Sequence, residues 1–321
     1  MNISLAPLQG FTEYPFRNAM AIIGGIDKFY TPFIKFENDG SIKSKHINDL
    51  LPENNEVINL IPQILVNNSK HFLQLAQIIE EYGYTELNWN LGCPYPMVAK
   101  RKLGSGLLAF PELIDEILNE VIPKTKLSIS VKFRSGYSDD SEIDASIKTL
   151  NNFPLTELIY HPRIGKQLYK GRADLDKFTS INSKCNLPLA YNGDIDSTNK
   201  IYLLQNKFPN IHHIMIGRAL ISNPFLAYEF KTGKRLSDND KREQFSTFHG
   251  ILLEHYTVAL SGDSHLLNKF IHYWEYFSQI FVDNRKVYKK VKKCKKVSTF
   301  ISTVDDIIEN ATIKQTETDY E

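Results

Sequence analysis

The sequence predicts an α/β fold of the (β/α)8 or TIM-barrel type, followed by an all-α helical bundle. Eight short runs rich in β-branched and aromatic residues recur along the first two-thirds of the 321-residue chain, and stretches with helical spacing separate them. Strands that alternate with helices build a parallel sheet. Eight such units predict a closed barrel, in which the carboxyl ends of the strands line the active site.

The individual elements follow from local patterns. In the helix at 69–82, Phe72, Leu75 and Ile79 share one face. The strand at 128–132 reads Ser-Ile-Ser-Val-Lys, and we expect its polar side chains to face the barrel interior or its ends. The expected strands are 3–6, 28–30, 60–65, 86–90, 128–132, 157–160, 187–191 and 213–216, and the expected helices are 15–23, 69–82, 111–122, 142–152, 174–183, 197–207 and 219–230.

The character of the chain changes near residues 232–237, beyond which strand patterns give way to long helical ones. In 270–281, apolar and aromatic residues recur on one helical face. We therefore expect two domains, a catalytic barrel over residues 1–234 and a helical bundle over residues 235–321.

Composition excludes several classes of protein. The chain is 42% hydrophobic, yet no apolar run approaches the roughly 20 residues of a membrane span. The amino-terminal segment lacks the pattern of a signal peptide. Three widely spaced cysteines argue against a disulfide framework and for a cytoplasmic setting. We expect no metal site, since no CxxC or HExxH pattern occurs.

Cys93 is the first candidate for chemistry. It lies in Asn90-Leu-Gly-Cys-Pro94, directly after an expected strand, and its flanking Gly92 and Pro94 predict a turn that exposes the thiol. Such a thiol could act as a nucleophile or as an acid. Cys185 and Cys294 lack such flanks, and we expect them to be structural.

Lys132 ends one expected strand, and His161 directly follows the next. A strand-end lysine is often only a solvated charge, and a lone histidine is often structural. Their neighbouring positions favour a joint role, in which Lys132 places a cation beside an anionic cofactor and His161 donates a hydrogen bond to the same group.

Two glycine-containing turns follow the last two expected strands, where barrels commonly bind phosphate. Glycine permits close approach of a ligand to the backbone, and arginine offers a fork of donors. Gln63 carries both a donor and an acceptor, as the edge of a flavin requires. Since no GxGxxG motif follows a strand, a barrel-bound FMN fits better than a Rossmann-bound NAD. The residues concerned are Asn192-Gly193-Asp194, Gly217-Arg218, Pro7-Leu8-Gln9 and Gln63.

The segment Arg285–Lys296, called the basic segment below, holds eight basic residues and no acidic one. It could be merely a solvated helix face. Because Val287, Val291 and Cys294 keep an apolar stripe at helical spacing, we expect it to be folded and to offer a fixed basic surface for RNA.

Together these segments resemble tRNA-dihydrouridine synthases, flavin enzymes that reduce uridine in tRNA. The resemblance spans the whole barrel in the family's order, and the helical region resembles the family's RNA-binding domain. The matching segments are Ala6-Pro7-Leu8 with Pro15-Phe16-Arg17, Gln63, Asn90-Leu-Gly-Cys-Pro94 with Gly104-Ser-Gly106, Val131-Lys132-Phe133-Arg134, His161-Pro162-Arg163, Asn192-Gly193-Asp194 and Ile216-Gly217-Arg218 with Asn223-Pro224.

The resemblance implies a reaction and a cofactor site. NADPH, or NADH, would bind transiently and reduce FMN. The flavin N5 would then deliver hydride to C6 of the uracil, and Cys93, as general acid, would protonate C5. Lys132 and His161 would stabilise the anionic reduced flavin. The implied FMN ligands are Pro7, Leu8, Gln9, Gln63, Lys132, His161, Asn192, Gly193, Asp194, Gly217 and Arg218.

The resemblance also implies tRNA as the partner, with no membrane or metal, and a monomeric cytoplasmic protein. The chain is most like the bacterial subclass acting on U16. It departs from the common pattern at Gln9, Pro32 and Pro162. The implied substrate contacts are Asn90 with the uracil, and Lys35, Arg163, His272, Lys292 and Lys293 with the tRNA.

Two other functions stay open at this point. A barrel that binds FMN could reduce a small molecule such as a pyrimidine or an enone, although such an enzyme does not need a basic helical appendage. Alternatively, the protein could be an RNA-binding module that has lost catalysis, although the intact set of Cys93, Lys132 and Arg218 speaks against this.

Overall fold

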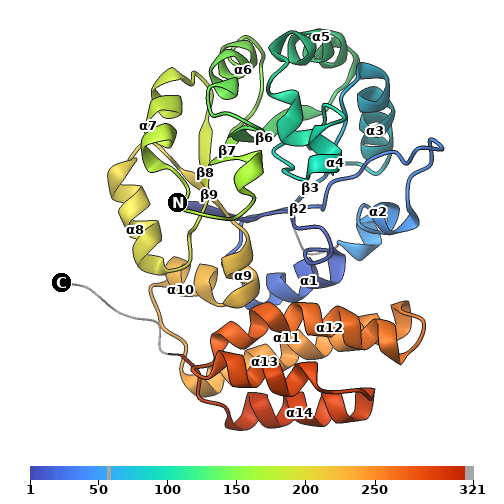
Figure 1. Cartoon of the computed structure of the whole chain (residues 1–321), viewed down its shortest axis with the longest axis vertical. Helices are drawn as coiled ribbons and strands as arrows, with labels where there is room; N and C mark the ends of the chain where they lie inside the picture. Colours follow the sequence, from blue (N-terminus) through green and yellow to red (C-terminus); the bar gives the residue numbers. More distant parts are fainter. Residues whose placement is uncertain (56–58, 315–321) are drawn as a thin grey trace. The chain divides into compact units, whose positions relative to one another are not determined.

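The structure, a computed structural model, describes residues 1–55 and 59–314, and it confirms the predicted barrel (Figure 1). Its strands form one sheet in the order β3-β2-β1-β9-β8-β7-β6-β5-β4, and every pairing is parallel. The strands are β1 (Asn2–Leu5), β2 (Lys28–Tyr30), β3 (Leu60–Ile61), β4 (Gln63–Ile64), β5 (Glu86–Leu91), β6 (Ser128–Gly136), β7 (Leu158–Ile164), β8 (Leu189–Asn192) and β9 (His213–Ile216).

The sheet closes because its two outermost strands belong to one extended segment. β3 and β4 are separated only by Pro62, which has no N–H and cannot continue the ladder. β3 pairs with β2 and β4 pairs with β5, while the carbonyl of Pro62 accepts a hydrogen bond from the amide of Asn88 (2.8 Å). The strand predicted at 60–65 is therefore present but divided, and eight extended segments form the barrel.

Two strands run further than predicted. β6 continues to Gly136 and β7 to Ile164, so Lys132 and His161 lie inside strands and not at their ends. Successive side chains of a strand point to opposite faces, and this alternation continues through the added residues. On the outward face Phe133 stacks on Tyr160 (ring centroids 4.8 Å apart), and Tyr160 stacks on Phe178 of α7 (5.9 Å). Alternation thereby directs Ser130 and Lys132 of β6 and His161 of β7 to the barrel interior, as expected, whereas Ser135 lies on the outward face and bonds the hydroxyl of Tyr160 (2.7 Å).

The chain divides into two compact units. The first comprises Met1–Tyr14, Asp27–Asp194 and Phe208–Ile216, and the second comprises Pro15–Ile26, Ile195–Lys207 and the described residues from Gly217 onward. The first unit holds every strand of the sheet. Its helices are α2 (Ser44–Asn48), α3 (Ser69–Glu81), α4 (Pro96–Ala99), α5 (Pro111–Val121), α6 (Glu142–Leu150) and α7 (Leu175–Lys184), with 3-10 turns η1 (Pro52–Asn54), η2 (Gly104–Leu107), η3 (Ile122–Lys124) and η4 (Gly165–Gln167).

The second unit is helical. Phe16 on its first helix is fully buried against Phe248 and Tyr273 (5.4 and 5.8 Å between centroids). Its helices are α1 (Tyr14–Ile23, from Pro15), α8 (Thr198–Lys207), α9 (Arg218–Ser222), α10 (Leu226–Thr232), α11 (Asp238–Ala259), α12 (Asp263–Phe277), α13 (Asn284–Lys292) and α14 (Val297–Asn310), with the 3-10 turn η5 (Ser278–Ile280). The proposed domain boundary at 234/235 stays a prediction, and residues 315–321 lie outside the described residues.

The helix expected at 219–230 is wrong as a single element. It forms two helices, α9 and α10, because Pro224 between them lacks the N–H that a continuous helix needs. The predicted change of character at 232–237 has a local cause. α10 ends before Gly233 at φ +65°, and Ser237 begins α11 by exchanging side-chain and backbone hydrogen bonds with Asp240.

An aromatic core fills the second unit. The residues expected on one face of 270–281 are buried, among them Phe270, Trp274 and Phe277. Trp274 donates its Nε1–H to Nε2 of the buried His249 (3.2 Å). Burial lowers the pKa of His249 to about 3, so this ring is a neutral part of the core. In the described residues, no helix is long and apolar enough to cross a membrane.

Candidate active site

The carboxyl halves of β5, β6 and β7 bring the predicted catalytic residues together. In the sheet register, Asn90 on β5 lies beside Lys132 on β6, and Arg134 on β6 lies beside His161 on β7. Cys93 follows β5 by two residues, and the charge of Lys132 influences the pKa of its thiol. Cys93 and Lys132 therefore lie at the same end of the barrel, as the sequence predicts.

The backbone of Cys93 is held from two sides. The side-chain carbonyl of Asn90 accepts hydrogen bonds from the amides of Gly92 (3.0 Å) and Cys93 (2.8 Å). The carbonyl of Cys93 accepts from the amide (3.1 Å) and the hydroxyl (2.9 Å) of Ser105. Gly104 permits this approach, since a Cβ at its φ of +57° would lie 2.7 Å from Cβ of Cys93.

The thiol is buried, which corrects the expectation that the turn exposes it. Cys93 is 5% exposed because the segment at Gly104 packs directly on it. Burial raises the pKa of the thiol, while the backbone amide of Tyr95 and the charges of Arg134, Lys132 and Lys35 oppose that rise. A raised pKa keeps the proton on sulfur at neutral pH, which suits a proton donor better than a thiolate nucleophile.

A chain of buried amides supports Asn90. Its Nδ2 donates to Oε1 of Gln63 (2.7 Å), Nε2 of Gln63 donates to Oδ1 of Asn88 (2.8 Å), and Nδ2 of Asn88 donates to the hydroxyl of Ser130 (3.0 Å). Sequence reasoning missed Asn88 and Ser130. The signal was the alternation of Asn88 with Asn90 and of Ser130 with Lys132, which places each pair on one face of its strand.

Lys132 places a positive charge in the site without an acidic partner among the described residues. Its side chain points into the barrel, and within the described residues its ammonium group makes no hydrogen bond or ion pair with protein. Burial, together with the nearby charge of Arg134, lowers its pKa to about 7, and Cys93 opposes this shift. An anionic ligand would relieve that cost, so the site fits a group that carries or develops negative charge.

His161 and Arg163, both on β7, form a buried polar group with Asp194. An Nη1 of Arg163 lies 3.2 Å from Nε2 of His161, and Nη2 donates to Asp194 (2.6 Å) and to the carbonyl of Gly171 (2.7 Å). Arg163 was expected to contact tRNA and Asp194 to bind FMN. In the structure the Arg163 side chain is 1% exposed and has these internal partners, and both expected contacts stay predictions.

The other expected cofactor residues follow β1, β8 and β9. Gln9 donates to the carbonyl of Phe33 (2.9 Å), and Pro7 and Leu8 are half-buried in the same loop. Asn192 ends β8 and donates to the carbonyl of Met215 (2.7 Å). Gly217 directly follows β9 and precedes Arg218, the first residue of α9; both belong to the second unit. Their contacts with a cofactor stay predictions.

An apolar and aromatic rim near Cys93 was missed by sequence reasoning. Tyr95 and Met97 are 58% and 83% exposed, and Tyr169 is 41% exposed. Tyr95 is close enough to Tyr169 and Cys93 for their charges to raise its pKa, although burial is the largest cause. Arg134 lies over the Tyr169 ring (5.4 Å) and donates to the carbonyl of Leu168 (2.8 Å). Large apolar and aromatic residues in the segments after β5 and β7 were the available signal in the sequence.

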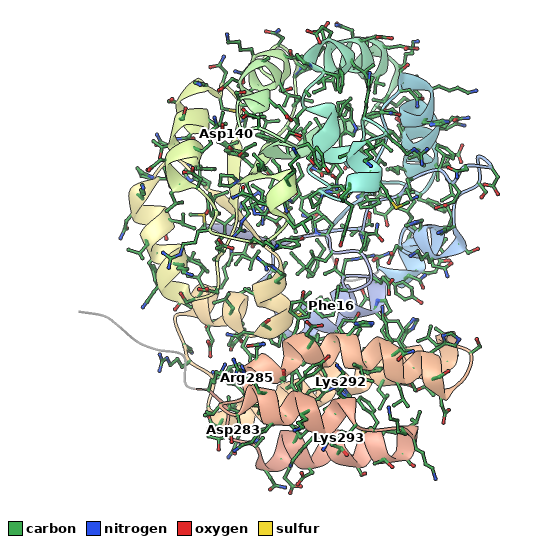
Figure 2. The ribbon with its side chains drawn as sticks, viewed as in Figure 1. Phe16, Asp140, Asp283, Arg285, Lys292 and Lys293 are labelled. Carbon is green, nitrogen blue, oxygen red and sulfur yellow. The ribbon has the colours of Figure 1, made fainter. Side chains whose placement is uncertain are left out.

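The expected RNA contacts are accessible side chains except for Asn90 and Arg163. Lys35 is half-buried and pairs with Glu37 (3.4 Å), and His272 is exposed on α12. The basic segment is folded as predicted, since Val287, Val291 and Cys294 are buried and all eight of its bases are exposed. Figure 2 labels Arg285, Lys292 and Lys293 in this segment.

Only some of these bases have acidic partners. Lys286 pairs with Asp283 (3.1 Å) and Lys290 with Asp306 (3.4 Å). Lys292 lies over the ring of Tyr288 (5.8 Å). Neither Lys292 nor Lys293 forms an ion pair with the described part of the chain. The segment therefore carries a net positive charge on a fixed helical surface.

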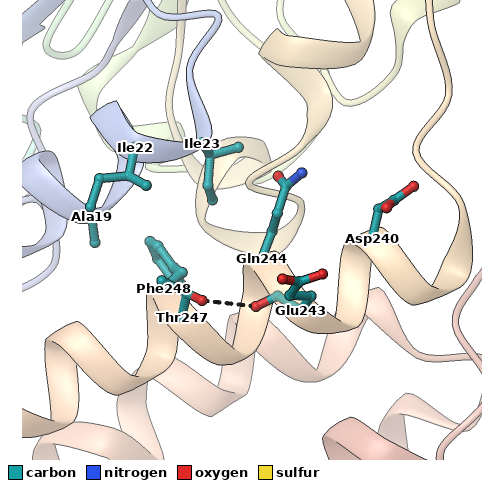
Figure 3. A pocket seen from close by; sticks show the side chains of 8 residues that line it. All are labelled: Ala19, Ile22, Ile23, Asp240, Glu243, Gln244, Thr247 and Phe248. Carbon is teal, nitrogen blue, oxygen red and sulfur yellow. Dashed lines mark hydrogen bonds between the residues drawn. The ribbon is translucent and has the colours of Figure 1, made fainter.

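The second unit also has a hollow of about 260 Å³ between α1 and α11, with apolar Ala19, Ile22 and Phe248 on its wall (Figure 3). Its acidic residues, Asp240 and Glu243, are exposed, and Asp240 already caps α11. No group of three or more metal-ligating side chains occurs in residues 1–55 and 59–314. The lining of the hollow thus lacks the thiol and the cations that gather near Cys93.

Comparison with known proteins identifies a family and several relatives. The profile of the family described as "Dihydrouridine synthase (Dus)" matches residues 4–312. The chain is 29% identical over 245 residues to tRNA-dihydrouridine synthase B of Pasteurella multocida, covering 74% of this chain and 70% of the relative. It is 28% identical over 232 residues to the protein of the same name from Vibrio cholerae, covering 72% and 71%. A third relative with this name, from Pseudomonas putida, is 26% identical over 268 residues, covering 82% and 78%.

Proposed function

Because the chain belongs to the dihydrouridine synthase family, we propose that it reduces one uridine of tRNA to 5,6-dihydrouridine, at position 16 of the D-loop. FMN would be its bound cofactor and NADPH its reductant. Three of its relatives are named tRNA-dihydrouridine synthase B, which supports tRNA as the substrate. A tRNA substrate and three free cysteines support a cytoplasmic protein, and we expect it to be monomeric.

Cys93 is the proposed proton donor to C5 of the uracil. Its buried thiol keeps a raised pKa, so the proton is present when the base arrives. Asn90 and Ser105 hold its backbone, which fixes the direction from which the proton comes. When bound, FMN supplies the hydride that C6 of the uracil accepts.

The groups at the carboxyl end of the barrel suit a flavin. Lys132 offers a cation without a protein partner among the described residues, and His161 lies on the neighbouring strand. A cation held in place before the reaction stabilises negative charge without reorganisation. Asn192 and Gly193 after β8, with Gly217 and Arg218 after β9, are proposed to hold the FMN phosphate.

The proposed tRNA contacts come from both units. The target base must leave its stack to reach Cys93. The rim residues Tyr95 and Tyr169 offer exposed rings of the kind that stack on unpaired bases. Lys292 and Lys293 of the basic segment are proposed to contact tRNA phosphates, together with Lys35 and His272. For Arg163, the contacts with His161 and Asp194 support a role within the protein.

The observation that carries this proposal is the buried thiol of Cys93 at the same barrel end as Lys132. Purified protein should be yellow and should convert an unmodified tRNA transcript to one containing dihydrouridine in the presence of NADPH, as measured by mass spectrometry of its nucleosides. A transcript with cytidine at position 16 is the matched control for the position. Colourless protein without flavin would overturn the cofactor assignment.

The same assay distinguishes tRNA reduction from the alternative function, reduction of a small molecule. A small-molecule reductase would oxidise NADPH with 2-cyclohexenone or free uridine as readily as with tRNA. We expect turnover with tRNA and little with either small molecule. Equal or faster turnover with a small molecule would favour the alternative.

A further inference from the structure

The guanidinium of Arg163 determines where the proton of His161 resides. Its Nη1 lies 3.2 Å from Nε2 of His161, within hydrogen-bonding range. A guanidinium stays protonated and has no acceptor, so the nitrogen facing it must accept. Nε2 of His161 therefore carries no proton, and the neutral ring bears its single N–H at Nδ1.

The surroundings of His161 also disfavour a second ring proton. A proton on Nε2 would break the Arg163 contact and add a positive charge beside that guanidinium. Lys132 and Arg134 on β6 contribute further positive charge, whereas the carboxylate of Asp194 is already paired with Arg163. The titratable and charged groups on the elements packed against His161 are Lys132, Arg134, Tyr160, Arg163, Asp174, Tyr191 and Asp194.

Asp194 holds the guanidinium in that position. Its Oδ2 accepts from Nη2 of Arg163 (2.6 Å) and from the amide of Ala173 (2.8 Å). Its φ of +47° is uncommon for a residue other than glycine, and such a conformation persists where surrounding contacts fix it. The contacts with Arg163 and Ala173 provide that constraint.

Gly193, which has no side chain, lets the turn after β8 pack closely on the ring of His161. A Cβ at Gly193 would lie 2.7 Å from Cβ of Ala173 and 3.3 Å from Cδ2 of His161. The turn after β8 and the segment after β7 therefore pack on the ring at the distance that only a glycine permits. The orientation of the ring is set by these contacts together with Arg163.

We propose that Arg163 and Asp194 are positioning residues that hold His161 as the neutral Nδ1–H tautomer in a single orientation. Both then act through His161, and neither contacts tRNA or FMN. The tautomer itself follows from geometry, whereas its use toward the flavin rests on the proposed function.

Nitrogen-15 NMR of histidine-labelled, flavin-loaded protein tests the tautomer, with His161→Gln identifying the resonances. We expect wild-type His161 to show a protonated Nδ1 and an unprotonated Nε2 between pH 5.5 and 8.5, a range set around the ordinary histidine pKa of about 6.5. In Arg163→Met the ring should lose this single tautomer and titrate near pH 6.5. A wild-type ring that carries its proton on Nε2, or a variant that leaves the spectrum unchanged, would overturn the proposal.

The pH dependence of the flavin midpoint potential tests the same role, because a substitution with a merely structural effect would not change it. Arg163→Met should introduce an ionisation near pH 6.5 that wild type lacks. The double variant Arg163→Met with His161→Gln should lack it again. An ionisation that survives in the double variant would contradict the role of His161.

A milder variant guards against misfolding. Arg163→Lys keeps the charge but removes the planar fork that reaches His161, Asp194 and Gly171 together. We expect it to fold and to show both histidine tautomers, and retention of the wild-type spectrum would count against the proposal. Since the NMR readout does not involve tRNA, failure of tRNA reduction and failure of this inference are separable.

Discussion

The surroundings of Cys93 and the basic segment differ in how they use polar residues. Around Cys93, neutral amides form a buried chain in which Asn90, Gln63 and Asn88 each have defined partners. In the basic segment, charged side chains are exposed above a buried stripe of Val287 and Val291. The first arrangement fixes the position of one atom, and the second supplies an electrostatic field. Substitutions around Cys93 should therefore impair the chemical step, whereas substitutions in the basic segment should weaken tRNA binding.

Removing the thiol should give the largest effect. Cys93→Ala should retain flavin but reduce tRNA turnover by about 10²- to 10⁴-fold, the range typical of a lost general acid. Single-turnover oxidation of the reduced flavin by tRNA measures this. Cys185→Ala, at a half-buried cysteine outside the amide chain, is the matched control. Undiminished turnover of Cys93→Ala would contradict the acid role.

Reversing two charges of the basic segment should weaken binding and leave chemistry intact. Lys292→Glu with Lys293→Glu should weaken tRNA binding by roughly tenfold or more at physiological salt and lower the salt slope of binding by about two. Filter binding over a salt series measures this. Lys124→Glu with Lys126→Glu, before the start of β6, is a control of equal charge. Equal effects of the two pairs would mean that only total charge matters.

Breaking the amide chain should show that Cys93 depends on residues it does not touch. Asn88→Leu leaves Nε2 of Gln63 without its acceptor and should cost about 1–3 kcal/mol in unfolding free energy. We also expect kcat to fall with little change in the Kd for tRNA. Ser130→Ala, which removes one acceptor at the far end of the chain, should have a smaller effect on kcat. If Ser130→Ala lowers kcat more than Asn88→Leu does, the series of hydrogen-bonded amides does not support Cys93 in this way.

The last expected effect concerns the pH dependence of stability. Lys132 has a folded-state pKa of about 7, below its usual 10.5. Between these values the unfolded chain binds more protons than the folded protein, so stability contributed by this group rises with pH. The unfolding free energy of flavin-free wild type, relative to Lys132→Met, should therefore increase from pH 7 to pH 9.5. A constant difference across that range would contradict the lowered pKa.

The barrel could be predicted because its strands and helices repeat with clear periods, and the joint placement of Cys93, Lys132 and His161 followed from parallel topology. Strand ends were less predictable, because β6 and β7 are extended by contacts such as Tyr160 with Phe178, which bring together distant segments. The internal roles of Arg163 and Asp194 could not be foreseen for the same reason. Their pairing depends on the turn after β8 meeting a side chain of β7, and no local pattern records that.

The most direct test of the proposed function is to map dihydrouridine in tRNA from a strain that lacks this gene. Loss of dihydrouridine at position 16, with restoration by the wild-type gene and not by Cys93→Ala, is the expected result. A modification pattern identical to that of the parent strain would contradict the proposed tRNA reduction.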